Sequence, residues 1–270
     1  MARKKTEKPE PLPQAQMKYE FVEGDEKEIA PGVIVRRIRA LVAIPATPFT
    51  AAVAPGDLGG YIQSVDNLNA QVSGDARVSG NARVSGNARV SGNAWVYGNA
   101  RVSGNAWVYG DAQVYGDARV YGDARVYGNA RVSGNAWVYG DAQVYGDARV
   151  YGDAQVYGDA RVYGNAWVSG NAWVYGNAWV YGNAWVYGAG LVFWASCVGT
   201  ENGTLTIYNA KDNTLLVTRG CFKGTVDEFL AASKRYHDER THHEYRLLIE
   251  VGTSRIEAAR AAVGEVEPAE

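Results

Sequence analysis

Valine recurs at every sixth position from Val72 to Val192, which places 21 valines in one uninterrupted register. In nearly every unit the order is Val, Ser or Tyr, Gly, Asn or Asp, Ala, and then Arg, Trp or Gln. A period of six fits neither the 3.6-residue period of an α-helix nor the heptad of a coiled coil. It fits a short strand followed by a tight bend, stacked many times.

The alternation of side chains along such a strand separates an inner from an outer face. In the stretch Ala76-Arg77-Val78-Ser79, the alanine and the valine share one face and the arginine and the serine share the other. Gly80-Asn81 then turns the chain, because glycine has no Cβ penalty at positive φ and Asn tolerates that region best among the other residues. The pattern predicts a solenoid of parallel strands with valine and alanine inside.

The pairing of an aliphatic residue with a small residue four positions later, as in Val78 with Ala82 and Val84 with Ala88, resembles the hexapeptide-repeat family. The resemblance implies a left-handed parallel β-helix, a triangular prism with three hexapeptides per coil. General connection rules favour right-handed crossovers, so the handedness comes from the resemblance alone. With strands roughly 4.8 Å apart, the repeats would make about seven coils and a rod of about 33 Å.

Wrapping the sequence at three hexapeptides per coil places the outward aromatic residues in columns that can stack. One edge carries Tyr109, Tyr127, Tyr145, Tyr163 and Tyr181. A second carries Tyr121, Tyr139, Tyr157 and Tyr175, followed by Phe193, and the third is interrupted by serines (Tyr97, Tyr115, Ser133, Tyr151, Ser169, Tyr187). The plain interpretation is that these columns stabilise the rod.

The tryptophans suggest an interaction surface. Trp167, Trp173 and Trp179 fall on three sides of about one coil, and Trp185 begins the next. Large exposed apolar patches are unusual on lone soluble proteins, so this girdle should be covered by the C-terminal segment, a second copy or another partner. We favour self-association, and the family resemblance implies a trimer packed through flat prism faces.

The flanking segments divide the chain into residues 1–16 (a flexible tail), 17–70 (an N-terminal β cap), 71–193 (the repeats), 194–264 (a small α+β module) and 265–270 (a tail). Two strands are expected in residues 17–24 and 32–44, around a turn at Ala30-Pro31-Gly32. The following stretch resembles the N-terminal region of bacterial and prophage-encoded hexapeptide-repeat proteins in Gly56, Asp57, Leu58, Gly59, Gly60, Tyr61, Asp66, Asn67 and Leu68. A phosphate-binding role for its glycines is disfavoured because no helix follows them.

The C-terminal segment predicts a β-hairpin around residues 210–213 and then a helix that begins at a capping box of Thr225 and Glu228. A second box, Thr241 and Glu244, precedes a longer helix that runs to about Ala262. The phrase from Cys221 to Thr225 resembles the C-terminal segment of the same prophage group. The expected fold class is therefore mainly β, with a β-helix between a β cap and an α+β module.

Enzymatic activity is disfavoured. Hexapeptide-repeat acyltransferases need a histidine base and the related zinc carbonic anhydrases need histidine ligands, but the repeats contain no histidine. A metal site made of His237, Glu239, His242, His243 and Glu244 is also disfavoured, since their spacing does not put three ligands on one helix face. Cys221 could be a nucleophile with His237 as its base, but a buried structural cysteine is the interpretation that we favour. We expect no cofactor and no metal.

Charge and cysteine content limit the partners. The net charge of −2, with nine arginines and eight aspartates in residues 71–190, gives no bulk attraction for nucleic acid or an anionic membrane. No apolar run is long enough to span a bilayer, and two cysteines suit a reducing bacterial cytoplasm, with association to a virion also open.

The sequence thus predicts a non-enzymatic structural or interaction protein, phage- or prophage-encoded, that forms a rigid self-associating rod. The alternatives are a carbohydrate- or nucleotide-binding scaffold and a degenerate acyltransferase that binds acyl-CoA between neighbouring subunits.

Overall fold

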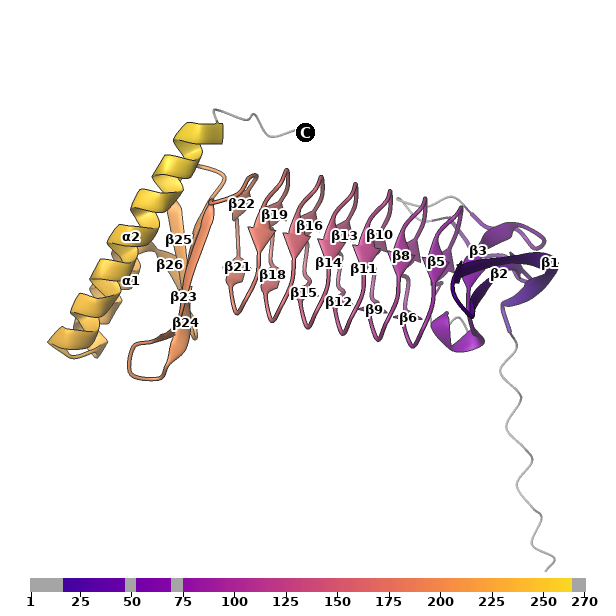
Figure 1. Ribbon diagram of the computed structural model, residues 1–270, viewed down its shortest axis with the longest axis horizontal. Helices are drawn as coiled ribbons and strands as arrows, with labels where there is room; N and C mark the ends of the chain where they lie inside the picture. Colours follow the sequence, from indigo (N-terminus) through magenta and orange to yellow (C-terminus); the bar gives the residue numbers. More distant parts are fainter. Residues whose placement is uncertain (1–16, 47–51, 69–74, 264–270) are drawn as a thin grey trace, which may run out of the picture.

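The computed structural model describes residues 17–46, 52–68 and 75–263, and it consists of a rod closed by a different small structure at each end (Figure 1). The first valine of the register, Val72, and the predicted boundary between cap and repeats at residues 70–71 lie outside the described residues.

The rod is a parallel β-solenoid, and each strand pairs with the strand one coil further along the chain, as Val114 does with Val132. Each of its three sides is a parallel sheet, which we name by its first strand in the rod. The β4 face comprises β4 (Arg77–Val78), β7 (Trp95–Val96), β10 (Gln113–Val114), β13 (Arg131–Val132), β16 (Arg149–Val150), β19 (Trp167–Val168) and β22 (Trp185–Val186). The β5 face comprises β5 (Arg83–Val84), β8 (Arg101–Val102), β11 (Arg119–Val120), β14 (Trp137–Val138), β17 (Gln155–Val156) and β20 (Trp173–Val174). The β6 face comprises β6 (Arg89–Val90), β9 (Trp107–Val108), β12 (Arg125–Val126), β15 (Gln143–Val144), β18 (Arg161–Tyr163) and β21 (Trp179–Tyr181).

The interior of the rod is valine and alanine. From Ala82 to Val180 every repeat valine and alanine is fully buried. Each coil therefore buries apolar surface against the coils above and below it, and burial of this kind contributes about 25 cal/mol per Å². The predicted coil of three hexapeptides and the inward-facing valines are confirmed, whereas the left-handed winding implied by the resemblance stays a prediction.

Glycine turns each corner of the prism. Gly122 has a φ of +73°, and a Cβ built on it would lie 3.0 Å from the nitrogen and 3.1 Å from the oxygen of Gly140 on the next coil. In the described repeats, the neighbouring Asn or Asp residues do not have positive φ. Positive φ at the first central residue alone is the pattern of a type II′ turn, and the glycines are needed both for this conformation and for the close approach of adjacent coils.

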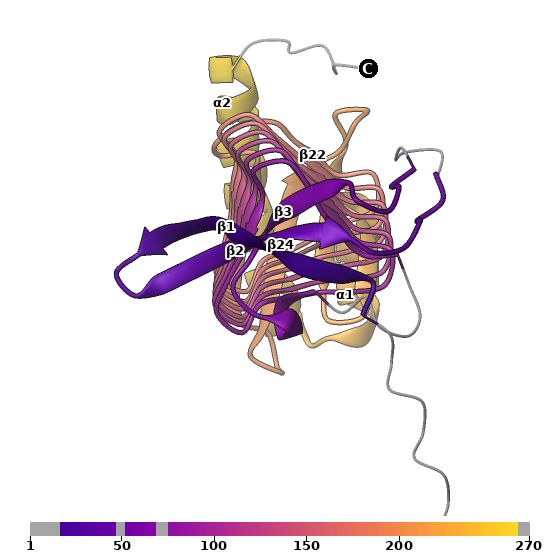
Figure 2. The same ribbon diagram turned by 90° about the vertical axis from the view of Figure 1, so that its right-hand side faces the viewer.

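The N-terminal cap extends the β5 face beyond the repeats. β1 (Tyr19–Ala30) and β2 (Val33–Ala40) form an antiparallel hairpin, and β3 (Leu58–Ile62) joins β2 to β5. Seen along the rod, the hairpin crosses the rod end and projects beyond one side (Figure 2). Gly59 and Gly60 lie in β3, where added Cβ atoms would meet Ile38 and Val78, so close packing explains these glycines.

A short 3₁₀ helix, η1 (Val65–Asn67), closes the end of the β6 face. The buried Asn67 amide donates to the carbonyl oxygens of Gly86 and Ala88, each at 2.9 Å, and its oxygen accepts from the backbone nitrogens of Gln63 and Ser64. Leu68 forms an isolated parallel bridge to Val90. The Asp-Asn-Leu phrase thus satisfies strand-edge groups that a bare solenoid end would expose.

The C-terminal module closes the other end in two layers. An antiparallel sheet of β23 (Val192–Val198), β24 (Gly203–Asn209), β25 (Leu215–Arg219) and β26 (Phe222–Thr225) lies between the rod and two helices (Figure 1). The helices are α1 (Val226–Tyr236) and α2 (Glu239–Val263). Thr218 donates to the carbonyl of Trp179 at 2.7 Å, and Asn209 donates to the carbonyl of Trp185 at 2.8 Å, which anchors the sheet on the last coil.

The predicted hairpin around residues 210–213 and the capping box of Thr225 and Glu228 are both confirmed. The second capping box was wrong. Asp238 accepts from the backbone nitrogen of Thr241 at 2.7 Å and α2 begins at Glu239, because an aspartate three residues earlier offers the same cap. Among the described residues, neither helix combines the length and the apolar composition that a bilayer-spanning segment needs.

Candidate functional site: the sides of the rod

Stacked tyrosines form the most regular feature of the outer surface. On the β6 face the ring centroids of Tyr109, Tyr127 and Tyr145 are 4.8 Å apart and nearly parallel, and the column continues through Tyr163 to Tyr181. On the β5 face, Tyr121, Tyr139, Tyr157 and Tyr175 stack at 4.8–5.0 Å. Among the described residues of the interrupted β4 face, only Tyr97 and Tyr115 stack in this way. The spacing is that of neighbouring strands, so the columns follow from the period of one coil.

Burial in the columns raises the pKa of two phenols in particular. Burial, with the neighbouring phenols Tyr163 and Tyr127 as a smaller cause, raises the pKa of Tyr145 to about 12. Burial likewise raises the pKa of Tyr97 to about 12. Tyr97 and Tyr145 therefore carry no negative charge near neutral pH and are not activated nucleophiles.

Beside each tyrosine column runs a second outward column, which contributes the residue before each valine. The guanidinium groups of Arg89, Arg119, Arg149 and Arg161 lie over the indole ring of the tryptophan on the next coil. The distances from guanidinium carbon to ring centroid are 4.8 Å for Arg119 and Trp137, 4.7 Å for Arg149 and Trp167, and 4.7 Å for Arg161 and Trp179. Cation–π contacts of this kind stabilise by about 0.5–1 kcal/mol at exposed sites. Tryptophan therefore has a structural role within the rod.

The corners of the prism carry a third kind of column, made of asparagine and aspartate. Asn93 donates to Asp111 at 3.0 Å, and Asn129 donates to Asp147 at 2.9 Å. Alternation of the two residue types lets an amide donate to a carboxylate on the next coil. The alternation is not complete at any corner, and one corner places three carboxylates in sequence, because Asp123, Asp141 and Asp159 follow one another on successive coils.

The predicted tryptophan girdle is largely covered by the chain itself. Trp185 is buried at 8% exposure under the C-terminal sheet. Trp167 and Trp179 are half-buried. Lys211 from the C-terminal module lies over the ring of Trp167. Only Trp173, at 50% exposure, stays open among the four.

The continuation of the β5 tyrosine column beyond Tyr175 was predicted wrongly. Trp194, not Phe193, contacts Tyr175, edge to face at 4.1 Å. The chain leaves the repeat register at this point, so Phe193 packs toward α2 at Gly252. An open groove of about 600 Å³ lies here and is lined by Trp173, Tyr175, Ala189, Gly190, Val192, Phe193, Trp194, Arg255 and Ala258.

Sequence reasoning missed a run of arginines on the β5 face. Arg83, Arg101 and Arg119 are consecutive members of the column before the valines, each directly paired with the next. The rest of that column is Trp137, Gln155 and Trp173. Sorting the arginines of the sequence by the period of one coil, as for the aromatic residues, would have identified the three consecutive arginines on this face.

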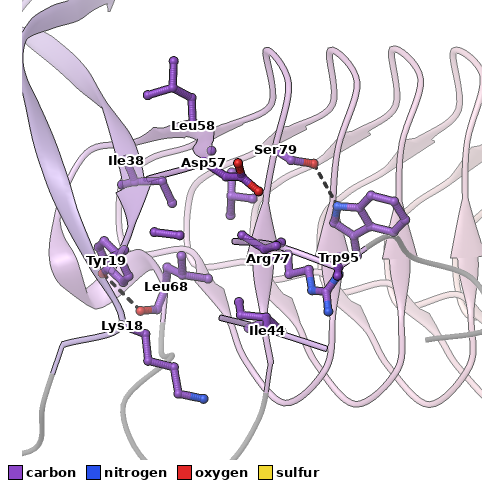
Figure 3. A pocket seen from close by; sticks show the side chains of 16 residues that line it. Lys18, Tyr19, Ile38, Ile44, Asp57, Leu58, Leu68, Arg77, Ser79 and Trp95 are labelled. Atoms are coloured by element: carbon purple, nitrogen blue, oxygen red, sulfur yellow. Dashed lines mark hydrogen bonds between the residues drawn. The ribbon is translucent and has the colours of Figure 1, made fainter. Parts of the chain in front are cut away.

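A mostly apolar hollow of about 340 Å³ lies between the N-terminal cap and the first coil (Figure 3). Ile38, Ile44, Leu68 and Val78 are among its lining residues. The Arg77 guanidinium donates to the carbonyl of Pro45 at 2.6 Å, and Lys18 points away from the hollow in Figure 3 and pairs with Asp75 at 3.3 Å. Burial lowers the pKa of Arg77. The described lining residues offer no pair of groups arranged for acid–base chemistry.

The candidate catalytic residues are separated from the rod's sides. His242 contacts Ser233, His243 contacts Arg246, and His237 lies beside the ring of Tyr245, all within the helical layer. In the described residues no three histidine, cysteine, aspartate or glutamate side chains gather closely enough to hold a metal ion. Cys197 and Cys221 are both free and exposed, so the prediction that Cys221 is buried was wrong, because it lies in the tight turn between β25 and β26.

These features define a β-solenoid repeat protein with aromatic stacks along its sides. The family model described as "YdcK Beta solenoid repeat" matches the chain at residues 70–84, 82–98, 94–110, 112–124, 124–140, 142–158, 154–170 and 172–188. The matches lie within the rod and its first, undescribed repeat residues. No curated protein matches the chain.

Proposed function

We propose that this protein is a non-enzymatic structural protein whose rod associates with further copies through its flat sides. The observation that supports the proposal is that the ends of the rod are covered whereas its sides expose large aromatic side chains. Both ends are covered by their own caps, whereas Trp107 and Trp173 on the sides keep 45% and 50% of their surface exposed. Exposed indoles beside arginine and tyrosine columns suit face-to-face contact, since Trp, Tyr and Arg dominate protein interfaces.

A role without catalysis is supported by the position of the histidines. All three lie in the helical layer of the C-terminal module and contact neighbouring side chains there. An acyltransferase of the hexapeptide-repeat type would instead need a histidine on the coils. The two free, exposed cysteines support our expectation of a reducing bacterial cytoplasm. Prophage origin remains a prediction from the resemblance alone.

The test is the molar mass of the full chain in solution by sedimentation equilibrium, over a wide concentration range. We expect an oligomer whose dissociation constant rises when Trp173 is changed to serine. Trp185→Ser is the matched control for lost indole area away from the sides, because Trp185 lies under the C-terminal sheet. It should affect stability more than association. A wild-type chain that is monomeric at every concentration would overturn the proposal.

A second candidate function is carbohydrate binding in the groove around Trp173, Tyr175 and Trp194. The open rings offer stacking surfaces for sugars, and Arg255 at the edge of the groove favours an acidic one. Titration with an oligosaccharide of uronic acid should quench tryptophan fluorescence, and Trp173→Ser should abolish the change. No quenching, or quenching unaffected by the substitution, argues against the groove as a sugar site.

A further inference from the structure

One side of the rod has a cationic half toward the N-terminal end and an aromatic half toward the C-terminal end. On the β5 face the column before the valines reads Arg83, Arg101, Arg119, Trp137, Gln155 and Trp173 from the N-terminal end to the C-terminal end. The column after the valines is divided in the same sense, from Ser85 and Ser103 to Tyr121, Tyr139, Tyr157 and Tyr175. Because the strands are in register, the division in the second column falls one coil nearer the N-terminal end than the division in the first.

The arrangement of the arginines on this face is electrostatically unfavourable. Arg83 and Arg101 each have another arginine directly on the next coil, and like charges placed opposite one another on neighbouring strands repel. Arg119 is the exception, because its guanidinium lies 4.8 Å from the centroid of the Trp137 ring. The chain itself therefore shows the partner that suits an arginine on this surface, which is an indole ring on the other half of the same face.

We infer that the β5 face binds the β5 face of a second copy in antiparallel orientation, about a two-fold axis across the rod. This inference rests on the proposed self-association and names its surface and geometry. The six strands of the face are equally spaced, so an axis between β11 and β14 brings strand one opposite strand six, two opposite five and three opposite four. Arg83 then meets the partner's Trp173, Arg101 meets the partner's Gln155, and Arg119 meets the partner's Trp137.

The second column is matched in size by the same operation. A two-fold axis along the strand direction keeps each column opposite its own kind, with the order reversed. Ser103 faces the partner's Tyr157, so that a small side chain lies opposite a large one. Ser85, which falls opposite the partner's Tyr175, is buried at 7% exposure, and Tyr121 meets the partner's Tyr139 at the centre. Asp153, at the corner beside Gln155, brings a carboxylate to the height of the partner's Arg101. A two-fold contact of this kind is self-complementary and closed.

A parallel arrangement lacks this complementarity. An axis along the rod, or the three-fold axis of a trimer, places the same coils of each copy at the same height. The three arginines of each copy would then gather at one end and repel across the interface. The exposure of Trp173 at 50% and Tyr175 at 37% leaves the aromatic half free to receive the arginines.

Cross-linking distinguishes the two arrangements. Asn81 and Asn87 are exposed corner residues that flank β5, and Asn177 is the exposed corner residue that follows β20. In a full chain with Cys197→Ser and Cys221→Ser, each is changed singly to cysteine, and pairs of variants are mixed with a bis-maleimide that spans about 15 Å, since packed sheets lie about 10 Å apart. The antiparallel pair predicts a covalent dimer from Asn87→Cys mixed with Asn177→Cys. A parallel pair predicts one from Asn87→Cys mixed with Asn81→Cys.

Affinity measurements identify the face. Arg101→Ala should weaken self-association at least tenfold, whereas Arg125→Ala, an equally exposed arginine on the β6 face, should leave it unchanged. Oligomers that cross-link between positions 87 and 81, that fail to cross-link at these corners, or that depend on Arg125 and not on Arg101 would overturn the antiparallel pairing and leave self-association standing. A monomeric wild-type chain would overturn both.

Discussion

Two requirements select glycine at the corners, which are a positive φ and close approach of the backbone of the next coil. Two positions in the rod allow these requirements to be tested separately. Gly122 has positive φ and also lies against the backbone of Gly140, whereas Gly182 has a φ of +70° with nothing within 4 Å of an added Cβ. An L-residue at positive φ costs roughly 1–2 kcal/mol.

We therefore expect Gly182→Ala to lower the free energy of unfolding by about that amount and Gly122→Ala to lower it by clearly more. Urea denaturation of the two variants measures the difference. Equal losses would mean that the coils can separate at no cost and that close approach does not select glycine.

The carboxylate of Asp141 lies between two others of the same corner column, Asp123 and Asp159. Asp141→Asn should raise the free energy of unfolding by about 0.5 kcal/mol at low salt, because it removes repulsion and allows an amide to donate as Asn129 does to Asp147. Asp147→Asn is the control and should be destabilising, since that carboxylate already accepts from Asn129. Loss of the gain in about 1 M NaCl would confirm its electrostatic origin, and a destabilised Asp141→Asn variant would contradict the account.

At the scale of the element, the tyrosine column links stability to pH. The Tyr145 phenol titrates near pH 10 in the unfolded chain, and burial raises its pKa to about 12 in the fold. Between these values the folded state holds the proton more tightly, so this contribution is complete below pH 10 and is lost as pH rises through 12.

Thermal unfolding followed from pH 9 to pH 12 should show a steep fall in Tm for the wild type and a shallower one for Tyr145→Phe. The substitution keeps the stacked ring and removes only the titrating group. Identical slopes would show that the column does not control alkaline unfolding.

The elements that could be predicted from the sequence are those that repeat. The six-residue repeat, with fixed positions for valine, glycine and tyrosine, is enough to predict short strands, glycine corners and tyrosine columns, because every coil places the same residue types in the same environment. Phe193 and Trp194 show where this stops, since the chain leaves the register there and the choice of outward residue depends on α2, which a local pattern does not reveal. Cys221 was misjudged for a similar reason, because its exposure depends on the turn between β25 and β26.

At the scale of the whole molecule, the C-terminal module contributes cover to the tryptophan girdle. The positions of Trp167, Trp173, Trp179 and Trp185 indicated that the girdle needed cover, and the sequence favoured a second copy over the C-terminal segment. The position of the C-terminal sheet on the last coil cannot be derived from the repeat pattern. The division of the β5 face into a cationic and an aromatic half could have been found by wrapping the arginines coil by coil. The orientation that we propose for a second copy needs the strand register as well, because the register places the cationic half and the aromatic half along the rod.

The central claim is that three hexapeptides make one complete coil, so that only whole coils can be removed without rotating one cap relative to the other. Deletion of residues 111–128 removes three hexapeptides, and deletion of residues 111–116 removes one. Both join glycine to an Asn or Asp and preserve the local repeat, so they differ in the length removed and in the phase of the coils that follow.

The distance between one spin label on the β1–β2 hairpin, which projects beyond one side of the rod, and one spin label on the C-terminal module tests this claim most directly. For the whole-coil deletion we predict that this distance shortens only by the height of one coil, about 5 Å. For the single-hexapeptide deletion we predict a different distance, because every coil after the deletion, and the C-terminal module with it, turns by a third of a turn relative to the hairpin. The same distance in both deletion proteins would contradict a coil of three hexapeptides.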